Sequence, residues 1–295
     1  MAVHEPVMVA EVLAALAPER GGLFVDCTVG LGGHAQALLE AGATRLIGID
    51  RDPEALELAR TALSRWGSQV ELLHADYREL GALLDARRID GVDGVLADLG
   101  VSSLQLDAAG RGFSFRRDEP LDMRMDPTAG ESAAEWIATA PESELADVIY
   151  QFGEERFARR IARAIVASRP KAAIGTTGQL AALVRRAIPS RGFQRIDPAT
   201  RTFQAIRIQV NRELDRLDAF LRDAASRLRA GARLAIISFH SLEDRIVKHT
   251  FRALVQGDPA ALRAVTRKPL TPDERETERN PRARSARLRV VERLA

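Results

Sequence analysis

The sequence lacks the residues and hydrophobic runs on which several classes of protein depend. Cys27 is its single cysteine, so no disulfide can form within the chain. The five histidines are scattered and have no second cysteine near them, so no metal-ligand spacing appears and we expect no metal site. No apolar run approaches the roughly 20 residues that span a bilayer, and no basic segment followed by an apolar core opens the chain. These absences predict a cytoplasmic protein that is not membrane-bound.

The charge of the chain is almost balanced, but its cations are nearly all of one kind. Lysine and arginine number 43 against 41 acidic residues, and the basic residues are almost entirely arginine. Arginine suits bidentate contacts with phosphate, although codon bias produces the same excess. A chain of 295 residues exceeds what one small core usually organises. The length therefore predicts two domains, or one domain with a large insertion.

A glycine-rich segment, DCTVGLGGH at Asp26 to His34, follows the first apolar run, Leu23 to Cys27, and precedes a stretch of helical spacing. On such a strand-to-helix turn, Gly30, Gly32 and Gly33 can adopt positive φ and admit a ligand to the unpaired N–H groups of the helix. Residues 30–35 also fit the dinucleotide-binding pattern G-x-G-x-x-A. The loop alone therefore predicts a nucleoside cofactor without choosing NAD or another, and a plain turn is the alternative.

Four successive strand-like segments carry an acid at or near their end. The segments are 23–27, 44–50, 70–77 and 92–98, with Asp26, Asp50, Asp76 and Asp98. An acid after the second strand can accept hydrogen bonds from both hydroxyls of a ribose, which favours an unphosphorylated nucleoside. The ligand crevice of a parallel sheet lies outside the carboxyl ends of its strands, so these acids should line one rim. A single aspartate there is as readily a helix cap, but four in succession favour a functional rim.

The alternation of strands and helices stops after Gly100. Residues 104–127 are rich in Arg, Asp, Gly and Pro and show neither helical nor strand periodicity. This predicts a long structured loop of functional importance. Helical segments follow at 132–138, 143–150, 154–168, 179–188 and about 201–230. The segment 154–168 has an apolar stripe and four arginines elsewhere around the helix. A solvated face is the simpler interpretation of these arginines, and a phosphate site is the alternative.

The buried-strand pattern resumes at 232–240, after Gly231, which we interpret as the C′ residue of the long helix. A helix near 241–255 follows, then β-like runs at 262–267 and 286–293 with no helix expected between them. A terminal antiparallel hairpin on a parallel sheet argues against a dinucleotide dehydrogenase. It favours an α/β, class I (Rossmann-like), seven-stranded S-adenosylmethionine (SAM)-dependent methyltransferase domain, formed by residues 1–105 and 213–295. A mostly helical insertion, 106–212, interrupts this domain.

Nine short segments, distributed over nearly the full length of the sequence, point to one protein family. They are GLGGHA at 30–35, IDRDP at 49–53, DLGVSSLQLD at 98–107, RGFSF at 111–115, PLDMRMDP at 120–127, GEERFARRIARAIV at 153–166, PATRTFQAIRI at 198–208, SFHSLEDRIVK at 238–248 and NPRARSARLR at 280–289. In these segments the chain resembles the bacterial small-subunit ribosomal RNA cytosine-N4 methyltransferase family, known as RsmH and formerly MraW. Departures at Cys27, Leu31 and Leu104 remove no group needed for binding.

The resemblance implies a cofactor, a reaction and a set of contacts. The cofactor would be SAM, and the enzyme would methylate the exocyclic N4 of one cytidine in small-subunit ribosomal RNA, within the assembled subunit. The implied cofactor contacts are Gly32, Gly33, His34, Asp50, Tyr77, Asp98 and Gln105. Helical spacing alone would instead point His34 into solvent at the start of its helix.

The remaining expectations concern the reaction and the recognition of RNA, which we expect of the insertion, 106–212. Asp98 is the candidate proton acceptor for the cytosine amine. The candidate substrate contacts are His240, Arg245 and Arg111, with further phosphate contacts among Arg116, Arg117, Arg191, Arg195 and Arg201. Phe113 or Phe115 could stack on a flipped base, although loop packing is the simpler interpretation. A methyltransferase for another RNA or a protein, or a non-catalytic RNA-binding assembly factor, stays open, as does a dimer.

Overall fold

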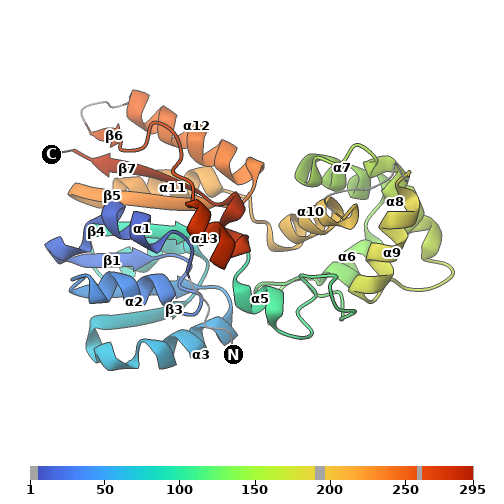
Figure 1. The fold of residues 1–295 in the computed structure, drawn as a ribbon, viewed down its shortest axis with the longest axis horizontal. Helices are drawn as coiled ribbons and strands as arrows, with labels where there is room; N and C mark the ends of the chain where they lie inside the picture. Colours follow the sequence, from blue (N-terminus) through green and yellow to red (C-terminus); the bar gives the residue numbers. More distant parts are fainter. Residues whose placement is uncertain (1–5, 190–196, 258–260, 295) are drawn as a thin grey trace. The chain divides into compact units, whose positions relative to one another are not determined.

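The structure is a computed structural model that describes residues 6–189, 197–257 and 261–294. The chain divides into two compact units, Met1–Gly100 with Leu214–Ala295, and Val101–Glu213. Figure 1 colours the first unit blue to cyan and orange to red, and the second green to yellow. Within the described ranges, no helix is both long and apolar enough to cross a membrane.

The first unit is built on a seven-stranded sheet with the order β3-β2-β1-β4-β5-β7-β6. The bounds of its strands are β1 Leu23–Asp26, β2 Arg45–Asp50, β3 Val70–His74, β4 Val92–Asp98, β5 Leu228–Ser238, β6 Leu262–Ala264 and β7 Arg287–Arg293. The first five run parallel, whereas β7 pairs antiparallel with both β5 and β6. The predicted seven-stranded Rossmann-like α/β fold is therefore confirmed.

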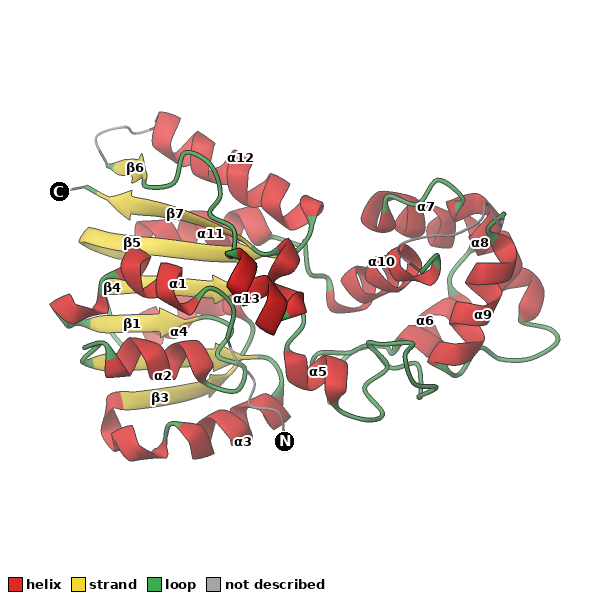
Figure 2. Cartoon of the chain, in the orientation of Figure 1, coloured by secondary structure: helices red, strands yellow, loops and turns green. Residues whose placement is uncertain are grey.

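Helices cover both faces of this sheet, as Figure 2 shows. Alternate strand residues point to opposite faces, so Val25 and Ile47 join one buried core while Phe24 and Leu46 join the other. The first core is covered by α4 Leu80–Ala86, α11 Leu217–Ser226 and α12 Ser241–Gly257. The second is covered by α1 Val9–Leu16, α2 Gly33–Glu40 and α3 Pro53–Ala62. Burial on both faces explains why these strands read as continuous apolar runs.

The predicted long helix over residues 201–230 is wrong. The chain instead forms α10 Ala199–Asn211 and α11, separated where Arg212 and Arg216 take positive φ values of 50° and 55°. The strand β5 already begins at Leu228, so Gly231 is not a helix C′ residue. Its φ of 79° lies inside β5, where the register against β4 shifts. A positive φ at such an irregularity is readily adopted only by glycine.

Two further features differ from the sequence prediction: an additional helix and the end of a strand. The short helix α13 Glu274–Arg279 and a 3₁₀ turn at Pro281–Ser285 lie between β6 and β7, where no helix was expected. No residue of α13 is buried, so it has no apolar stripe that could reveal it. The third strand ends at His74 rather than at Tyr77, because Asp76 caps a 3₁₀ turn that begins there.

The second unit is helical and has its own core. Its helices are α5 Ser103–Asp107, α6 Ala133–Thr139, α7 Glu142–Gly153, α8 Ala158–Ser168, α9 Thr177–Ala187 and α10. Ser132 and Thr176 begin α6 and α9 with capping boxes. The core is formed by apolar faces of α6 to α10 together with Leu121, Met123 and Met125 of the preceding loop.

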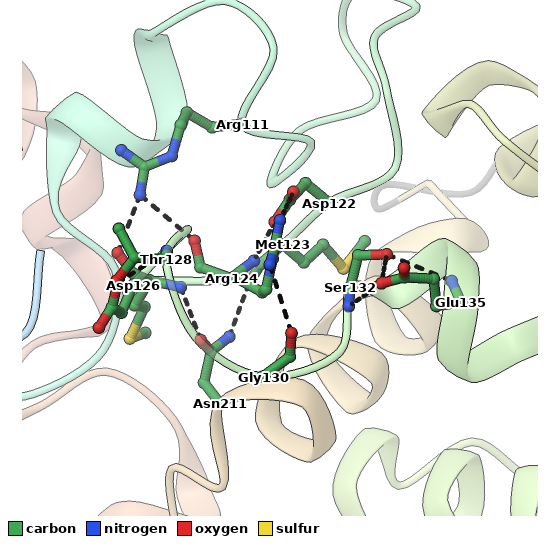
Figure 3. Close-up of polar contacts among 11 residues, drawn as sticks. Arg111, Asp122, Met123, Arg124, Asp126, Thr128, Gly130, Ser132, Glu135 and Asn211 are labelled. Carbon is green, nitrogen blue, oxygen red and sulfur yellow. Dashed lines mark hydrogen bonds and ion pairs between the residues drawn. The ribbon is translucent and has the colours of Figure 1, made fainter.

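The loop between α5 and α6 has a fixed conformation although it contains no regular element (Figure 3). The amide of Asn211 donates to the Met123 carbonyl at 2.7 Å and accepts from the Met125 N–H at 2.7 Å. The side chain of Met123 is wholly buried, and its φ is 62°, a strained value for a residue with a Cβ. Arg124 forms a two-pronged ion pair with Asp122. The buried amide thus holds a backbone that would otherwise relax.

We expect Asn211→Ala to lower the free energy of unfolding of the second unit by about 2–4 kcal/mol, because two buried backbone groups lose their partners. Trp136 lies in the core of this unit, so its fluorescence reports the transition once Trp66, in the first unit, is replaced by Phe. Thr200→Ala, at an exposed site on the same helix, is the control. Equal unfolding midpoints for the two variants would contradict this role.

Candidate active site

The glycine loop joins β1 to α2 and leaves space beside its backbone. Gly30 and Gly32 have φ values of 51° and 86°, so both use the left-handed region. A Cβ on Gly33 would lie 2.4 Å from Cγ of Pro6, whereas the nearest atom to a Cβ on Gly30 would be 3.8 Å away. The loop is therefore packed by protein on one side and open at Gly30, next to the N-terminus of α2. This arrangement suits a ligand that approaches backbone N–H groups.

Asp50, at the end of β2, fixes the glycine loop. One carboxylate oxygen accepts from the Gly30 N–H at 2.8 Å, and the other accepts from the Asp52 N–H at 2.9 Å. Burial raises the pKa of Asp50 to about 6, despite these hydrogen bonds to its ionised form. The carboxyl group therefore lies against the loop at the position expected of a ribose acceptor.

Asp26, His34 and Asp98 meet at the carboxyl ends of β1 and β4. His34 is only 6% exposed, and its Nε2 lies 3.6 Å from Oδ2 of Asp98. The expectation that His34 points into solvent is wrong, because the first turn of α2 directs it toward the sheet. One oxygen of the fully buried Asp26 accepts from the Thr28 N–H at 3.1 Å. Within the described residues, its other oxygen and Oδ1 of Asp98 have no hydrogen-bond partner.

The electrostatics of this cluster favour a cationic ligand. Burial raises the pKa of Asp26 to about 7; the charge of His34 opposes this rise, and the charges of Asp98 and Asp50 add to it. Burial lowers the pKa of His34, but its contact with Asp98 and the charges of Asp98, Asp26 and Glu276 outweigh burial, so the pKa is raised overall. The cluster thus holds one imidazole among an excess of carboxyl groups. A ligand that brings positive charge would compensate carboxylates that the protein leaves without partners.

Asp76 does not belong to this cluster. Its side chain caps the 3₁₀ turn at Tyr77–Glu79 and forms a two-pronged ion pair with Arg78, while Arg51 lies 3.5 Å away. These interactions outweigh desolvation and hold the pKa of Asp76 below its ordinary value. For this aspartate the helix-cap interpretation is the right one.

The other expected cofactor contacts lie in different units. Tyr77 is half-buried after β3, and its ring centroid lies 4.7 Å from that of Phe220. Gln105 belongs to the second unit, where its carbonyl oxygen accepts from the Ser102 N–H at 3.0 Å in the capping box of α5. Sequence reasoning missed Thr28, whose hydroxyl accepts from the Asp98 N–H at 2.7 Å and ties β4 to the glycine loop. In the sequence, only the position of Thr28 within the glycine-rich segment pointed to such a role.

The expected RNA contacts differ in exposure. His240 follows β5, and its Nε2 lies 3.1 Å from a carboxylate oxygen of Glu243, while Arg245 is exposed in the second turn of α12. Arg111 is 9% exposed, and its Nη2 donates to the carbonyls of Arg124 and Met125 (Figure 3). Those bonds give Arg111 a structural part in the loop.

The two phenylalanines of the loop are packed. Phe113 is buried in the core of the second unit, and the ring centroid of Phe115 lies 4.7 Å from that of Phe203. The loop-packing interpretation therefore holds for both. The predicted phosphate contacts Arg191 and Arg195 lie outside the described residues.

Comparisons with known proteins agree over the whole chain. A model of the MraW methylase family matches residues 1–294. Three relatives carry the name Ribosomal RNA small subunit methyltransferase H. That of Sorangium cellulosum is 49% identical and covers 99% of this chain and 91% of its own. That of Acidobacterium capsulatum is 51% identical over 98% of each chain. That of a Cyanothece species is 52% identical over 99% of this chain and 95% of its own.

A solved structure described as an rRNA methylase from Streptococcus thermophilus aligns over 100% of both chains. Its TM-score is 0.45 and its identity 13%, a likeness too weak to add to the fold described above.

A sheet of this order, with a glycine loop after its first strand and an acid at the end of its second, is that of the SAM-dependent methyltransferases, and the protein is an enzyme of this class. The family match and the relatives at about half identity narrow the class further. The chain belongs to the MraW methylase family.

The residues of the site fit this cofactor. SAM carries a sulfonium and an α-ammonium group, and the carboxyl groups of Asp26 and Asp98 each have a buried oxygen without a partner among the described residues. Asp50 would hold the ribose, and the open side of Gly30 would admit the nucleoside. When bound, SAM supplies an electrophilic methyl group.

We expect Asp26→Asn to stabilise the free protein at pH 8 and to weaken SAM binding at least tenfold. The pKa of Asp26 is raised on folding, so the folded state binds more protons than the unfolded state between about pH 4 and 7, and stability falls as pH rises through that range. Asparagine keeps the acceptor for Thr28 but removes the charge. Thermal unfolding at pH 5 and pH 8, with calorimetric titration of SAM, checks both effects.

The gain in stability should shrink at pH 5, where the native carboxyl group is largely protonated. A variant that is less stable than the native protein at pH 8, or that binds SAM equally well, would contradict the account of Asp26.

Proposed function

We propose that the protein methylates the exocyclic N4 of one cytidine in small-subunit ribosomal RNA. The substrate follows from the relatives, which cover nearly the whole chain at about 50% identity and carry the name of small-subunit rRNA methyltransferases. The cytosine N4 acceptor follows from the sequence resemblance. The observation that carries the chemistry is the carboxylate of Asp98, whose buried Oδ1 has no partner among the described residues.

The exocyclic amine of cytosine is a poor nucleophile because its lone pair is delocalised into the ring. An acceptor for an amine N–H bond helps the nitrogen to pyramidalise. The nitrogen then forms a bond to the methyl carbon, the carbon–sulfur bond breaks with its electron pair remaining on sulfur, and the amine proton needs an acceptor. We assign this part to Oδ1 of Asp98, at the carboxyl end of β4. Holding the two reactants together supplies much of the remaining acceleration, on the order of 7–11 kcal/mol.

Two neighbours position Asp98 for this step. Thr28 accepts a hydrogen bond from its backbone N–H, which fixes the end of β4 against the glycine loop. His34 faces its other carboxylate oxygen at 3.6 Å, and the raised pKa of His34 favours a charged imidazole there. A charged imidazole would direct Oδ2 away from the amine and leave Oδ1 available. In this assignment His34 is a positioning residue.

We further propose that the second unit recognises the RNA, and that His240 and Arg245 contact the target nucleotide. A base in structured RNA must leave its stack to reach a methyl-transfer site, and the flanking phosphates must then be held. The second unit offers many exposed arginines for this purpose.

The direct test is methyl transfer from labelled SAM to small ribosomal subunits, and to naked ribosomal RNA, from cells that lack this enzyme, followed by nucleoside analysis. We expect N4-methylated cytidine on the subunits. Label in another nucleoside would overturn the N4 assignment, and SAM binding without transfer to either substrate would overturn the proposed activity.

We expect Asp98→Asn, with SAM saturating, to lower kcat at least about a hundredfold, as loss of a general base usually does. Any loss of SAM affinity from the removed charge would change only the SAM concentration needed for saturation. Asparagine preserves the backbone N–H bond to Thr28 and the shape of the site. Asp93→Asn is the matched control, since Asp93 lies near the other end of β4 and is paired with Arg229. Single-turnover kinetics with saturating RNA measures the effect. Near-native turnover in Asp98→Asn would refute the assignment.

A further inference from the structure

The helix α8 carries three exposed arginines on one side, and a fourth exposed arginine precedes the helix. Arg159, Arg160 and Arg163 lie within the helix, and their spacing of three and four residues to Arg163 places them on one face. The opposite face is buried in the core of the second unit. Arg156 comes just before the helix, and its guanidinium carbon lies 4.6 Å from the ring centroid of Phe157. Figure 1 labels this helix α8 within the second unit.

These arginines have little acidic compensation. The side chains of Arg159 and Arg160 form no hydrogen bond or ion pair with any residue that the structure describes. Arg163 has a carboxylate oxygen of Glu142 at 3.8 Å, and its own side chain is 78% exposed. Like charges three and four residues apart destabilise a helix. The arginine face therefore carries an unfavourable repulsion that the packing of the second unit does not remove.

Exposed arginines on several other helices are paired with acids. On α3, Arg60 pairs with Glu57, and on α11 an oxygen of Asp218 lies 4.0 Å from Arg222. Arg185 of α9 forms a two-pronged contact with an aspartate of the loop before α10. The chain as a whole is nearly neutral, with 43 basic and 41 acidic residues. The arginine face of α8 is thus a local excess of positive charge within a nearly neutral chain.

We propose that the arginine face of α8 binds consecutive phosphate groups of the RNA backbone. Arginine presents planar forks that match phosphate geometry, and a row of them neutralises adjacent phosphates. At 1.5 Å per residue, Arg159 and Arg163 lie about 6 Å apart along the helix axis, so the face presents several guanidinium groups side by side, an arrangement that suits a polyanion. Backbone contacts of this kind set orientation and affinity without reading sequence. The inference rests on the proposed function, because the enzyme's own RNA substrate is the polyanion.

The test is the double variant Arg159→Ala/Arg160→Ala, with Arg60→Ala/Arg222→Ala as control. Both remove two positive charges from exposed helical positions, but the control arginines have acidic partners. Binding of labelled small-subunit RNA and of purified subunits is measured without SAM at about 50 to 200 mM salt. We expect the slope of log K against log salt to fall in magnitude by about 1–2 in the α8 variant, and affinity at low salt to fall at least tenfold. KM for RNA should rise while kcat and SAM affinity stay unchanged.

A second variant separates charge from structure. Arg159→Lys/Arg160→Lys keeps both charges, so it should retain the native salt slope and recover most of the affinity. A salt slope in the alanine variant equal to that of the control would overturn the inference, as would a fall in kcat with no change in KM. Because binding is measured without SAM, a failure of the N4 assignment would leave the salt-slope result intact and distinguishable.

Discussion

The crowding of carboxyl groups at the carboxyl ends of β1, β2 and β4 is the constraint on which the rest of the site depends. Parallel strands bring Asp26, Asp50 and Asp98 to one edge of the sheet. Burial makes the ionised forms of Asp26 and Asp50 costly, so their pKa values rise to about 7 and about 6. The free protein tolerates this because His34 and backbone N–H groups offset part of the cost. A cationic cofactor supplies the rest.

The same constraint explains how the glycine loop is built. Asp50 can hold its ligand only if its own orientation is fixed, and the N–H groups of Gly30 and Asp52 fix it. Thr28 ties the loop to β4 through the Asp98 N–H, so the loop connects the three strands whose carboxyl groups form the cluster. Positive φ at Gly30 and Gly32 allows the chain to turn closely enough to make these bonds. Cofactor binding and the position of Asp98 are therefore parts of one structure.

The sequence predicts the sheet and the acidic rim well because both arise from local pattern. Strands buried on both faces give continuous apolar runs, and an acidic residue after such a run can be recognised in the amino-acid sequence. The break between α10 and α11 was missed because Arg212 and Arg216 take positive φ, which neither residue type signals. The position of α13 was missed because that helix buries no residue. The burial of His34 depends on the direction of α2 against the sheet, which periodicity does not contain. The Asn211 contacts join residues more than 80 positions apart.

Calorimetric titration of SAM at about pH 6.5, in buffers with different ionisation enthalpies, tests the central claim most directly. In the free protein Asp26 is largely protonated at that pH, since burial raises its pKa to about 7. Binding of a cation beside it should ionise the carboxyl group and release a proton to the buffer. We expect the observed heat to depend on the buffer with the sign of proton release, and Asp26→Asn to abolish most of that dependence. The same heat in every buffer would contradict the account of a cofactor site built around uncompensated carboxyl groups.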